Sequence, residues 1–233
     1  MDYEAVFLDL DDTLYPYDPC NEAGKEAAHE TFLDLGYECS REEFEALYRE
    51  SRREVKRELA GTAAAHGRFG YFKRALRLHA DVHDAADALA LGEAYWDGFL
   101  AEMAPFEGVP ETLAACRDAG LDVVVVTNLT TRIQLRKLTV LGVDDLVDRV
   151  LTSEEAGREK PSGVMFTTPL ADLDLRPSEA VMVGNSVTSD IEGGNAAGLD
   201  TVLFNADTDR DLAAHERPDH RIEAFADLTE VVL

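Results

Sequence analysis

Residues 5–14 read A-V-F-L-D-L-D-D-T-L, a short apolar run followed at once by three carboxylates. The run from Ala5 to Leu8 is typical of a strand that is buried on both faces of a parallel sheet. Asp9 and Asp11 are two residues apart, so in an extended chain their side chains leave on the same side, at the carboxyl end of the strand. Open α/β sheets bind their ligands at that end.

The two carboxylates of this stretch repel each other. Their proximity raises the pKa of at least one of them unless a cation or a hydrogen-bond donor lies between them. A hard divalent ion such as Mg²⁺ relieves the repulsion, because it takes oxygen ligands and keeps open positions for phosphate oxygens. The alternative, on this stretch alone, is an acidic turn that binds nothing.

Composition narrows the class of protein. The chain has 233 residues, of which 45% are hydrophobic, and this is enough for a folded protein with a substantial core. Its 22 basic and 47 acidic side chains give a net charge of -25, which argues against a nucleic acid or an anionic membrane as a partner. Lysine is scarce beside this excess of acid. That balance predicts a cytoplasm of high salt, in which surface charges are screened over only about 3 Å at molar ionic strength.

No segment of the sequence is expected to direct the chain out of the cytoplasm. A basic start followed by a long apolar stretch is missing, so neither a signal peptide nor a membrane span is expected. The three cysteines, Cys20, Cys39 and Cys116, form no CxxC pair, which favours a reducing compartment. The sequence therefore predicts a cytoplasmic protein and leaves its oligomeric state open.

Residues 16–105 carry helical patterns only. Asp18 followed by Pro19 is a helix start, and Ser40 with Glu43 is a capping box for the next helix. No segment in this block alternates between apolar and polar residues as a strand does. The block is therefore predicted to be a bundle of about four helices, spanning roughly residues 18–35, 40–61, 69–79 and 84–104.

An arginine-rich segment lies inside this helical block. Most of it is interpreted as a solvated helix face paired with nearby glutamates. Arg68, Tyr71 and Lys73 follow a glycine-broken turn and are candidates for contacts with an anionic substrate, since a local basic cluster is unexpected in so acidic a chain.

Strand and helix patterns alternate through residues 106–233. Short connections between such units predict a Rossmann-like, doubly wound parallel sheet, which makes the chain an α/β protein. The predicted domains are a core of residues 1–15 and 106–233 and a helical insertion of residues 16–105. The predicted strands after the first cover residues 121–127, 149–152, 180–183 and 201–204.

Polar residues follow four of these strands in turn. Taken singly, a hydroxyl or a lysine after a strand is usually structural. Together they supply a nucleophile, an acid/base, a phosphate-binding hydroxyl and cation, and oxygens that orient a metal. The four groups are Asp9 with Asp11, Thr127 with Asn128, Lys160, and Asn185 with Asp190.

The order and spacing of these groups resemble the four motifs of the haloacid dehalogenase (HAD) superfamily. Motif one corresponds to D-L-D-D-T-L from Asp9, motif two to V-V-T-N ending at Asn128, motif three to Lys160-Pro, and motif four to G-N-S-V-T-S-D-I from Gly184. The helical insertion matches the position of a type-one cap. Stretches around Tyr15 and after Asp190 are similar to nucleotidase-like members of the phosphatase branch.

The resemblance implies a role for each of these residues. Asp9 is the expected nucleophile that forms an aspartyl phosphate, and Asp11 is the expected acid/base. Thr127, the Asn128 backbone and Lys160 are expected to hold the transferring phosphate oxygens. Mg²⁺ is expected to be bound by Asp9, by the backbone carbonyl of Asp11 and by Asn185. Asp190 is expected to orient metal waters or Lys160 from behind these ligands.

One residue departs from the family pattern. Aspartate usually stands where this chain has Asn185, and an amide oxygen binds Mg²⁺ more weakly than a carboxylate does. The resemblance therefore implies a Mg²⁺-dependent phosphomonoester hydrolase with reduced metal affinity, acting on a nucleoside monophosphate, a sugar phosphate or a phosphoglycolate-like acid.

Three alternatives remain beside this hydrolase. A haloacid dehalogenase proper needs no carboxylate at the position of Asp11. A receiver-like phosphate switch is about half this length and carries its aspartate mid-chain. A HAD-fold binding protein that has lost turnover is favoured only by Asn185.

Overall fold

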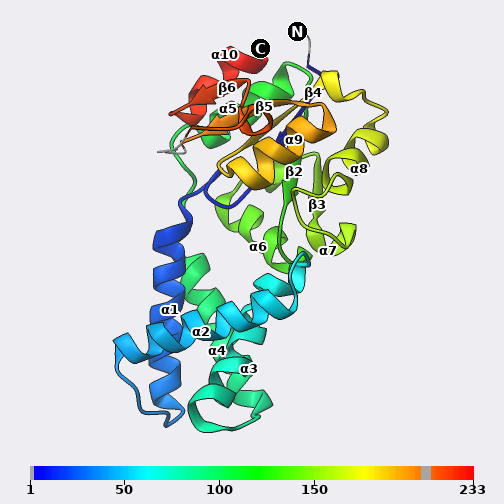
Figure 1. Cartoon of the computed structure of the whole chain (residues 1–233). Coiled ribbons are helices and arrows are strands. Elements are labelled where there is room, and N and C mark those ends of the chain that lie inside the picture. The colour runs from blue at the N-terminus through cyan, green and yellow to red at the C-terminus, as the bar shows by residue number, and fades with distance from the viewer. Residues whose placement is uncertain (1–2, 206–210) are drawn as a thin grey trace. The chain divides into compact units, whose positions relative to one another are not determined.

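The computed structural model describes residues 3–205 and 211–233, which form two compact units. The first unit contains Met1–Pro16 and Ala104–Leu233, and the second contains Tyr17–Met103. Figure 1 shows that the first unit holds a sheet with helices and that the second is made of helices. Each unit is described by itself.

The sheet unit contains six parallel strands in the order β3-β2-β1-β4-β5-β6. The chain runs outward from β1 to β3 and then returns to the other side of β1 with β4. The predicted α/β fold with a doubly wound parallel sheet is therefore confirmed, and the ligand-binding switch point of such a sheet lies beside β1. The strands are β1 (Ala5–Leu8), β2 (Asp122–Thr127), β3 (Arg149–Thr152), β4 (Ala180–Gly184), β5 (Asp200–Phe204) and β6 (His220–Ile222).

Both faces of the central strands are covered, which explains why these strands are apolar throughout. Alternate residues such as Phe7 and Val126 belong to one core cluster together with Phe166. The residues between them, Val6 and Val125 among others, are also fully buried. The helices of this unit are α5 (Val109–Asp118), α6 (Thr131–Leu141), α7 (Ser153–Ala156), α8 (Val164–Leu173), α9 (Glu192–Ala197) and α10 (Leu228–Val232).

The edge strand β6 was missing from the sequence prediction. It has only three residues, and two of them, His220 and Arg221, are exposed. An edge strand this short carries too little hydrophobic pattern to be recognised, and it is held by its register with β5.

The helical unit consists of α1 (Tyr17–Asp34), α2 (Arg41–Glu58), α3 (Arg68–Ala80) and α4 (Ala85–Ala101), with a short 3₁₀ turn at Ala63–His66. The predicted capping box is present, because Ser40 and Glu43 exchange hydrogen bonds at the start of α2. Asp84 caps α4 by accepting a hydrogen bond from the Asp87 amide. In the part of the chain that the structure describes, no helix has both the length and the apolar content that crossing a membrane requires.

Candidate active site

The chain turns sharply directly after β1. Asp12 adopts a positive φ of 59°, the Leu14 amide donates to the Leu10 carbonyl, and Asp11 forms an isolated bridge with Tyr15. The turn has its positive φ at Asp12, and the extended course expected from Asp9 to Asp11 stays a prediction. The turn lets the two carboxylates reach different partners, and Asp12 is a turn residue with a conformation that aspartate tolerates.

A buried trio of charges lies at the carboxyl end of β1. Lys160 Nζ is 2.7 Å from Asp9 Oδ1 and 2.8 Å from Asp190 Oδ1. The Lys160 side chain is 1% exposed, the Asp190 side chain is not exposed at all, and the Asp9 side chain is 12% exposed. The trio brings together residues that lie up to 181 positions apart in the sequence.

The charges of this trio do not balance. Burial raises the pKa of Asp9 to about 7, against the opposing effect of the Lys160 ammonium and with support from the carboxylates of Asp190 and Asp11. Burial also disfavours the charge of Lys160, yet Asp190 and Asp9 together raise its pKa. One ammonium therefore serves two buried carboxylates, and Asp9 still lacks a full counter-charge.

Neighbouring groups hold Lys160 in place from two sides. Its Nζ donates to the Val126 carbonyl at 2.6 Å, and its backbone amide donates to Asn128 Oδ1 at 2.8 Å. The Asn128 side chain thus orients the lysine, a positioning role that the sequence prediction did not include. It comes in addition to the predicted role of the Asn128 backbone.

Thr127 is the last residue of β2, and its hydroxyl has a buried partner. Gln134 Nε2, from α6, lies 2.5 Å from Thr127 Oγ1 and 3.1 Å from the Asn128 carbonyl. Gln134 is fully buried. Because this amide donates to Thr127 Oγ1, the hydroxyl hydrogen of Thr127 is left to be donated, and in this structure it points to the Asn128 carbonyl at 3.4 Å.

Asp11 pairs with a lysine that the sequence prediction missed. Lys137 Nζ is 2.6 Å from Asp11 Oδ1, and the Tyr15 hydroxyl donates to the same oxygen at 2.5 Å. Lys137 is fully buried on α6. One signal was present in the sequence: Lys137 stands on the apolar face of its helix, four residues from both Ile133 and Leu141.

The loop after β4 carries the remaining predicted residues. Asn185 directly follows the strand, and a π-helical turn at Val187–Ile191 brings Asp190 back toward it. Asp190 Oδ2 accepts from the Ser186 amide at 3.0 Å. A side chain at Gly184 would collide with this carboxylate, since its Cβ would lie 2.3 Å from Asp190 Oδ2. Glycine at this position therefore allows Asp190 to face Lys160.

The donor atoms at this sheet edge suit a hard cation. Asp9, Asp11 and Asn185 offer oxygen ligands only, and these are the ligands that Mg²⁺ prefers. The raised pKa of Asp9 records an excess of negative charge that a divalent cation would offset. The residues present therefore fit Mg²⁺.

Two of the three predicted substrate contacts of the helical unit are buried inside it. The Tyr71 hydroxyl donates to the Ala65 carbonyl at 2.6 Å, and Tyr71 is not exposed. Arg68 donates to the His66 carbonyl and stacks on aromatic rings, among them Trp96 at 5.1 Å. In this structure these two side chains therefore make their contacts within the helical unit.

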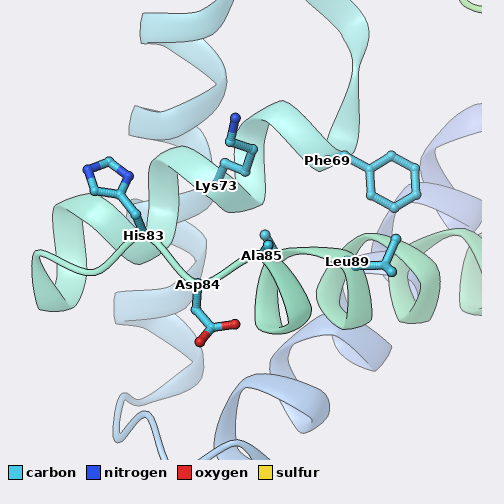
Figure 2. Close-up of a pocket in the computed structure, with 7 residues that line it drawn as sticks. Phe69, Lys73, His83, Asp84, Ala85 and Leu89 are labelled. Carbon is cyan, nitrogen blue, oxygen red and sulfur yellow. The ribbon is translucent and has the colours of Figure 1, made fainter.

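Lys73 has a different environment from those two residues. It is exposed and lines a surface cavity of about 390 Å³ between α3 and α4. Figure 2 shows Phe69 and Leu89 near one end of this cavity and His83 near the other. Of the three predicted contacts, Lys73 is therefore the exposed one, and its role toward a substrate stays a prediction.

Comparison with known proteins adds a family assignment to this geometry. The model of the haloacid dehalogenase-like hydrolase family matches residues 3–198. The ribulose-1,5-bisphosphate 5-phosphatase of Halopiger xanaduensis is 54% identical over 98% of both chains. The glyceraldehyde 3-phosphate phosphatase of Methanopyrus kandleri is 34% identical over 98% of this chain and 97% of that protein.

Solved structures share the fold along the whole chain. The HAD phosphatase of Thermococcus onnurineus has a TM-score of 0.76 at 23% identity and covers 100% of this chain and 98% of its own. The magnesium-bound HAD-hydrolase YfnB of Bacillus subtilis has a TM-score of 0.73 at 22% identity. The match covers 100% of this chain and 99% of that chain.

Proposed function

Because this chain belongs to the haloacid dehalogenase-like hydrolase family and is a phosphatase, we propose that it is a Mg²⁺-dependent phosphomonoester hydrolase that acts on a phosphorylated sugar through an aspartyl phosphate. The observation that carries the proposal is the Asp9 carboxylate, held at the end of the central strand by Lys160, with Asp11 two residues further on. This arrangement offers a nucleophile and a separate acid/base at one sheet edge.

The first half of the reaction uses Asp9 as the nucleophile. Lys160 contacts Oδ1, so the other carboxylate oxygen of Asp9 forms the new bond to phosphorus while the bond from phosphorus to the ester oxygen breaks. Asp11 donates a proton to that leaving oxygen. Lys160, Thr127 and the Asn128 amide stabilise the charge on the transferring oxygens.

The second half of the reaction restores the enzyme. Asp11 takes a proton from a water molecule, the water oxygen attacks the phosphorus of the aspartyl phosphate, and the bond to the Asp9 oxygen breaks to release inorganic phosphate. When bound, Mg²⁺ would offset the repulsion between the Asp9 carboxylate and the phosphate that it attacks. Asp9, the Asp11 carbonyl and Asn185 would hold the ion.

The expected effect of the substitution Asn185→Asp is tighter Mg²⁺ binding. The change restores a formal charge among the oxygen ligands, and we expect the Mg²⁺ dissociation constant to fall by about tenfold, which is about 1.4 kcal/mol. Isothermal titration calorimetry of the metal-free protein in molar KCl measures this without any reaction. Asn205→Asp, which makes the same chemical change at an exposed residue, is the matched control. An unchanged affinity for Mg²⁺ in Asn185→Asp would remove this side chain from the proposed ligand set.

Phosphate release from a panel of phosphate esters tests the proposed function. The panel contains ribulose-1,5-bisphosphate, glyceraldehyde 3-phosphate, phosphoglycolate and a nucleoside monophosphate, with Mg²⁺ and molar KCl. The similarity to a ribulose-1,5-bisphosphate 5-phosphatase favours the first of these, and we expect its kcat/KM to exceed that of the nucleotide by at least about tenfold. If no ester in the panel releases more phosphate than an Asp9→Asn control does, the proposal fails.

The rival functions make different predictions in the same assays. A haloacid dehalogenase would release halide from a 2-haloacid, a reaction that gives the Asp11 acid no leaving oxygen to protonate. A binding protein without turnover would bind Mg²⁺ and phosphate and release nothing. The buried partners of Asp11 favour the hydrolase over both, since they hold an acid/base at the sheet edge.

The two units are proposed to have different roles in the reaction. The sheet unit would carry the chemistry, and the helical insertion would choose the substrate as a type-one cap, with Lys73 as an exposed cation of that unit. A cytoplasm of high salt remains the proposed setting, in keeping with the net charge of -25.

A further inference from the structure

We propose that Lys137 is a positioning residue for the phosphatase reaction: with Tyr15, it covers one oxygen of Asp11 and thereby directs the other oxygen to the leaving group and the hydrolytic water. The inference rests on the proposed role of Asp11 as acid/base. It adds a fifth chain segment, the helix α6, to the four strand-end groups that the sequence identifies.

Two contacts to Asp11 meet at a single atom. Lys137 Nζ lies 2.6 Å from Oδ1, and the Tyr15 hydroxyl lies 2.5 Å from the same oxygen. Lys137 also stacks over the Tyr15 ring at 5.6 Å, so the two donors support each other. A carboxylate that accepts two charged or short hydrogen bonds on one oxygen has little freedom to rotate.

The Asp11 side chain is more exposed than its two donors are. Lys137 and Tyr15 are both fully buried, whereas the Asp11 side chain is 30% exposed. Since two buried donors cover Oδ1, we assign the accessible part of the carboxylate to Oδ2. Oδ2 is then the oxygen that can meet a bound ester, and α6 sets its direction.

Both proton transfers of the reaction depend on this orientation of Asp11. In the first step the proton on Asp11 moves to the ester oxygen as the bond from phosphorus to that oxygen breaks. In the second step a proton of the attacking water returns to the same Asp11 oxygen. An acid/base that donates and accepts at one place benefits from a fixed direction, because proton transfer requires heavy atoms within about 3 Å of each other.

A merely structural role for Lys137 is the competing explanation. A buried ammonium paired with one carboxylate can be retained without any part in the reaction. The two explanations differ in one respect. Loss of a positioned acid slows the departure of a poor leaving group far more than that of a good one, whereas loss of folded protein slows both equally.

Two aryl esters of similar shape make that comparison. Phenyl phosphate releases phenol, whose pKa is about 10 like that of tyrosine. p-Nitrophenyl phosphate releases a much more acidic phenol that leaves without a proton. For Lys137→Met with Mg²⁺ in molar KCl, we expect kcat/KM for phenyl phosphate to fall about 10²-fold, and at least about tenfold further than kcat/KM for p-nitrophenyl phosphate. Tyr15→Phe should show the same selectivity with a smaller loss.

Leu138→Ala on the same helix is the control. Leu138 is 2% exposed and its side chain has no group that could donate a hydrogen bond to Asp11, so its truncation should lower stability while leaving the ratio of the two esters unchanged. Equal losses on both esters in Lys137→Met and in Tyr15→Phe would overturn the proposal and leave Lys137 structural. If Lys137→Met does not fold, the ratio in Tyr15→Phe decides. Hydrolysis of p-nitrophenyl phosphate by the unaltered protein, and its loss in Asp9→Asn, reports separately on the proposed function.

Discussion

Asp9→Asn is expected to abolish phosphate release while leaving the protein folded. The substitution conserves volume and removes the oxygen nucleophile, so kcat/KM for p-nitrophenyl phosphate should fall by at least about 10³-fold, the scale of loss when a catalytic nucleophile is removed. A continuous assay of p-nitrophenol release with Mg²⁺ and molar KCl measures the effect.

The change in the free energy of unfolding caused by Asp9→Asn has a predictable sign. The pKa of Asp9 is higher in the folded chain than in the unfolded chain, so ionisation of Asp9 lowers the free energy of unfolding as pH rises from about 4 to about 7. Asparagine carries no such charge. In the absence of divalent metal above pH 7, the variant should therefore be at least as stable as the unaltered protein.

Asp12→Asn provides the matched control for this experiment. The substitution makes the same chemical change three residues later in the chain. Asp12 lies in a turn with a positive φ, a conformation that asparagine also tolerates. Its activity should change by no more than about threefold. Activity above a tenth of the unaltered level in Asp9→Asn would exclude Asp9 as the nucleophile.

Lys160→Met is expected to have the largest effect on stability. The ammonium is 1% exposed and separates two buried carboxylates, Asp9 and Asp190. Its loss leaves these charges buried without a counter-ion, which costs about 3–5 kcal/mol. Chemical denaturation of the metal-free protein, followed by circular dichroism, measures the free energy of unfolding. Phosphate release should also fall, by about 10²-fold or more, because a cation on the transferring oxygens is lost.

Two further variants test the cause of this destabilisation. Arg117→Met removes an ion pair with Asp148 in the same unit, but both side chains there are partly exposed, at 41% and 25%, so the cost should be about 1 kcal/mol or less. The double variant Asp9→Asn, Lys160→Met should recover part of the stability lost in Lys160→Met, since one of the stranded charges is gone. Without any recovery, the charges of the trio are not the source of the loss.

Local patterns in the sequence were sufficient for the fold class and for the strand-end residues. A wholly apolar strand such as Ala5–Leu8 needs burial on both faces. The alternation of such strands with helices therefore predicts a doubly wound parallel sheet, in which helices cover both faces. In such a sheet the carboxyl ends of neighbouring strands share one edge. Asp9, Thr127 and Asn185 could therefore be grouped from their places at strand ends, and Lys160 from its place in the connection that follows β3.

Side-chain partnership across long separations was decided only by the tertiary structure. Lys137 lies 126 residues from Asp11, and nothing in its helix distinguishes it from a surface lysine except its place on an apolar face. Arg68 and Tyr71 illustrate the opposite case. Their sequence pattern suggests polar groups that could bind a substrate, but in the structure these groups contact backbone carbonyls and, for Arg68, aromatic rings.

The stretch that begins with A-V-F-L-D-L-D-D shows which features the sequence determined and which ones the tertiary structure decided. Its sequence determined a buried strand with carboxylates at its end, because hydrophobic pattern and residue type are local properties. Which lysine faces which carboxylate was decided by the turn at Asp12 and by the packing of α6 and of the loop before α8. Those contacts depend on backbone direction and on the burial of distant side chains, and a single sequence carries neither.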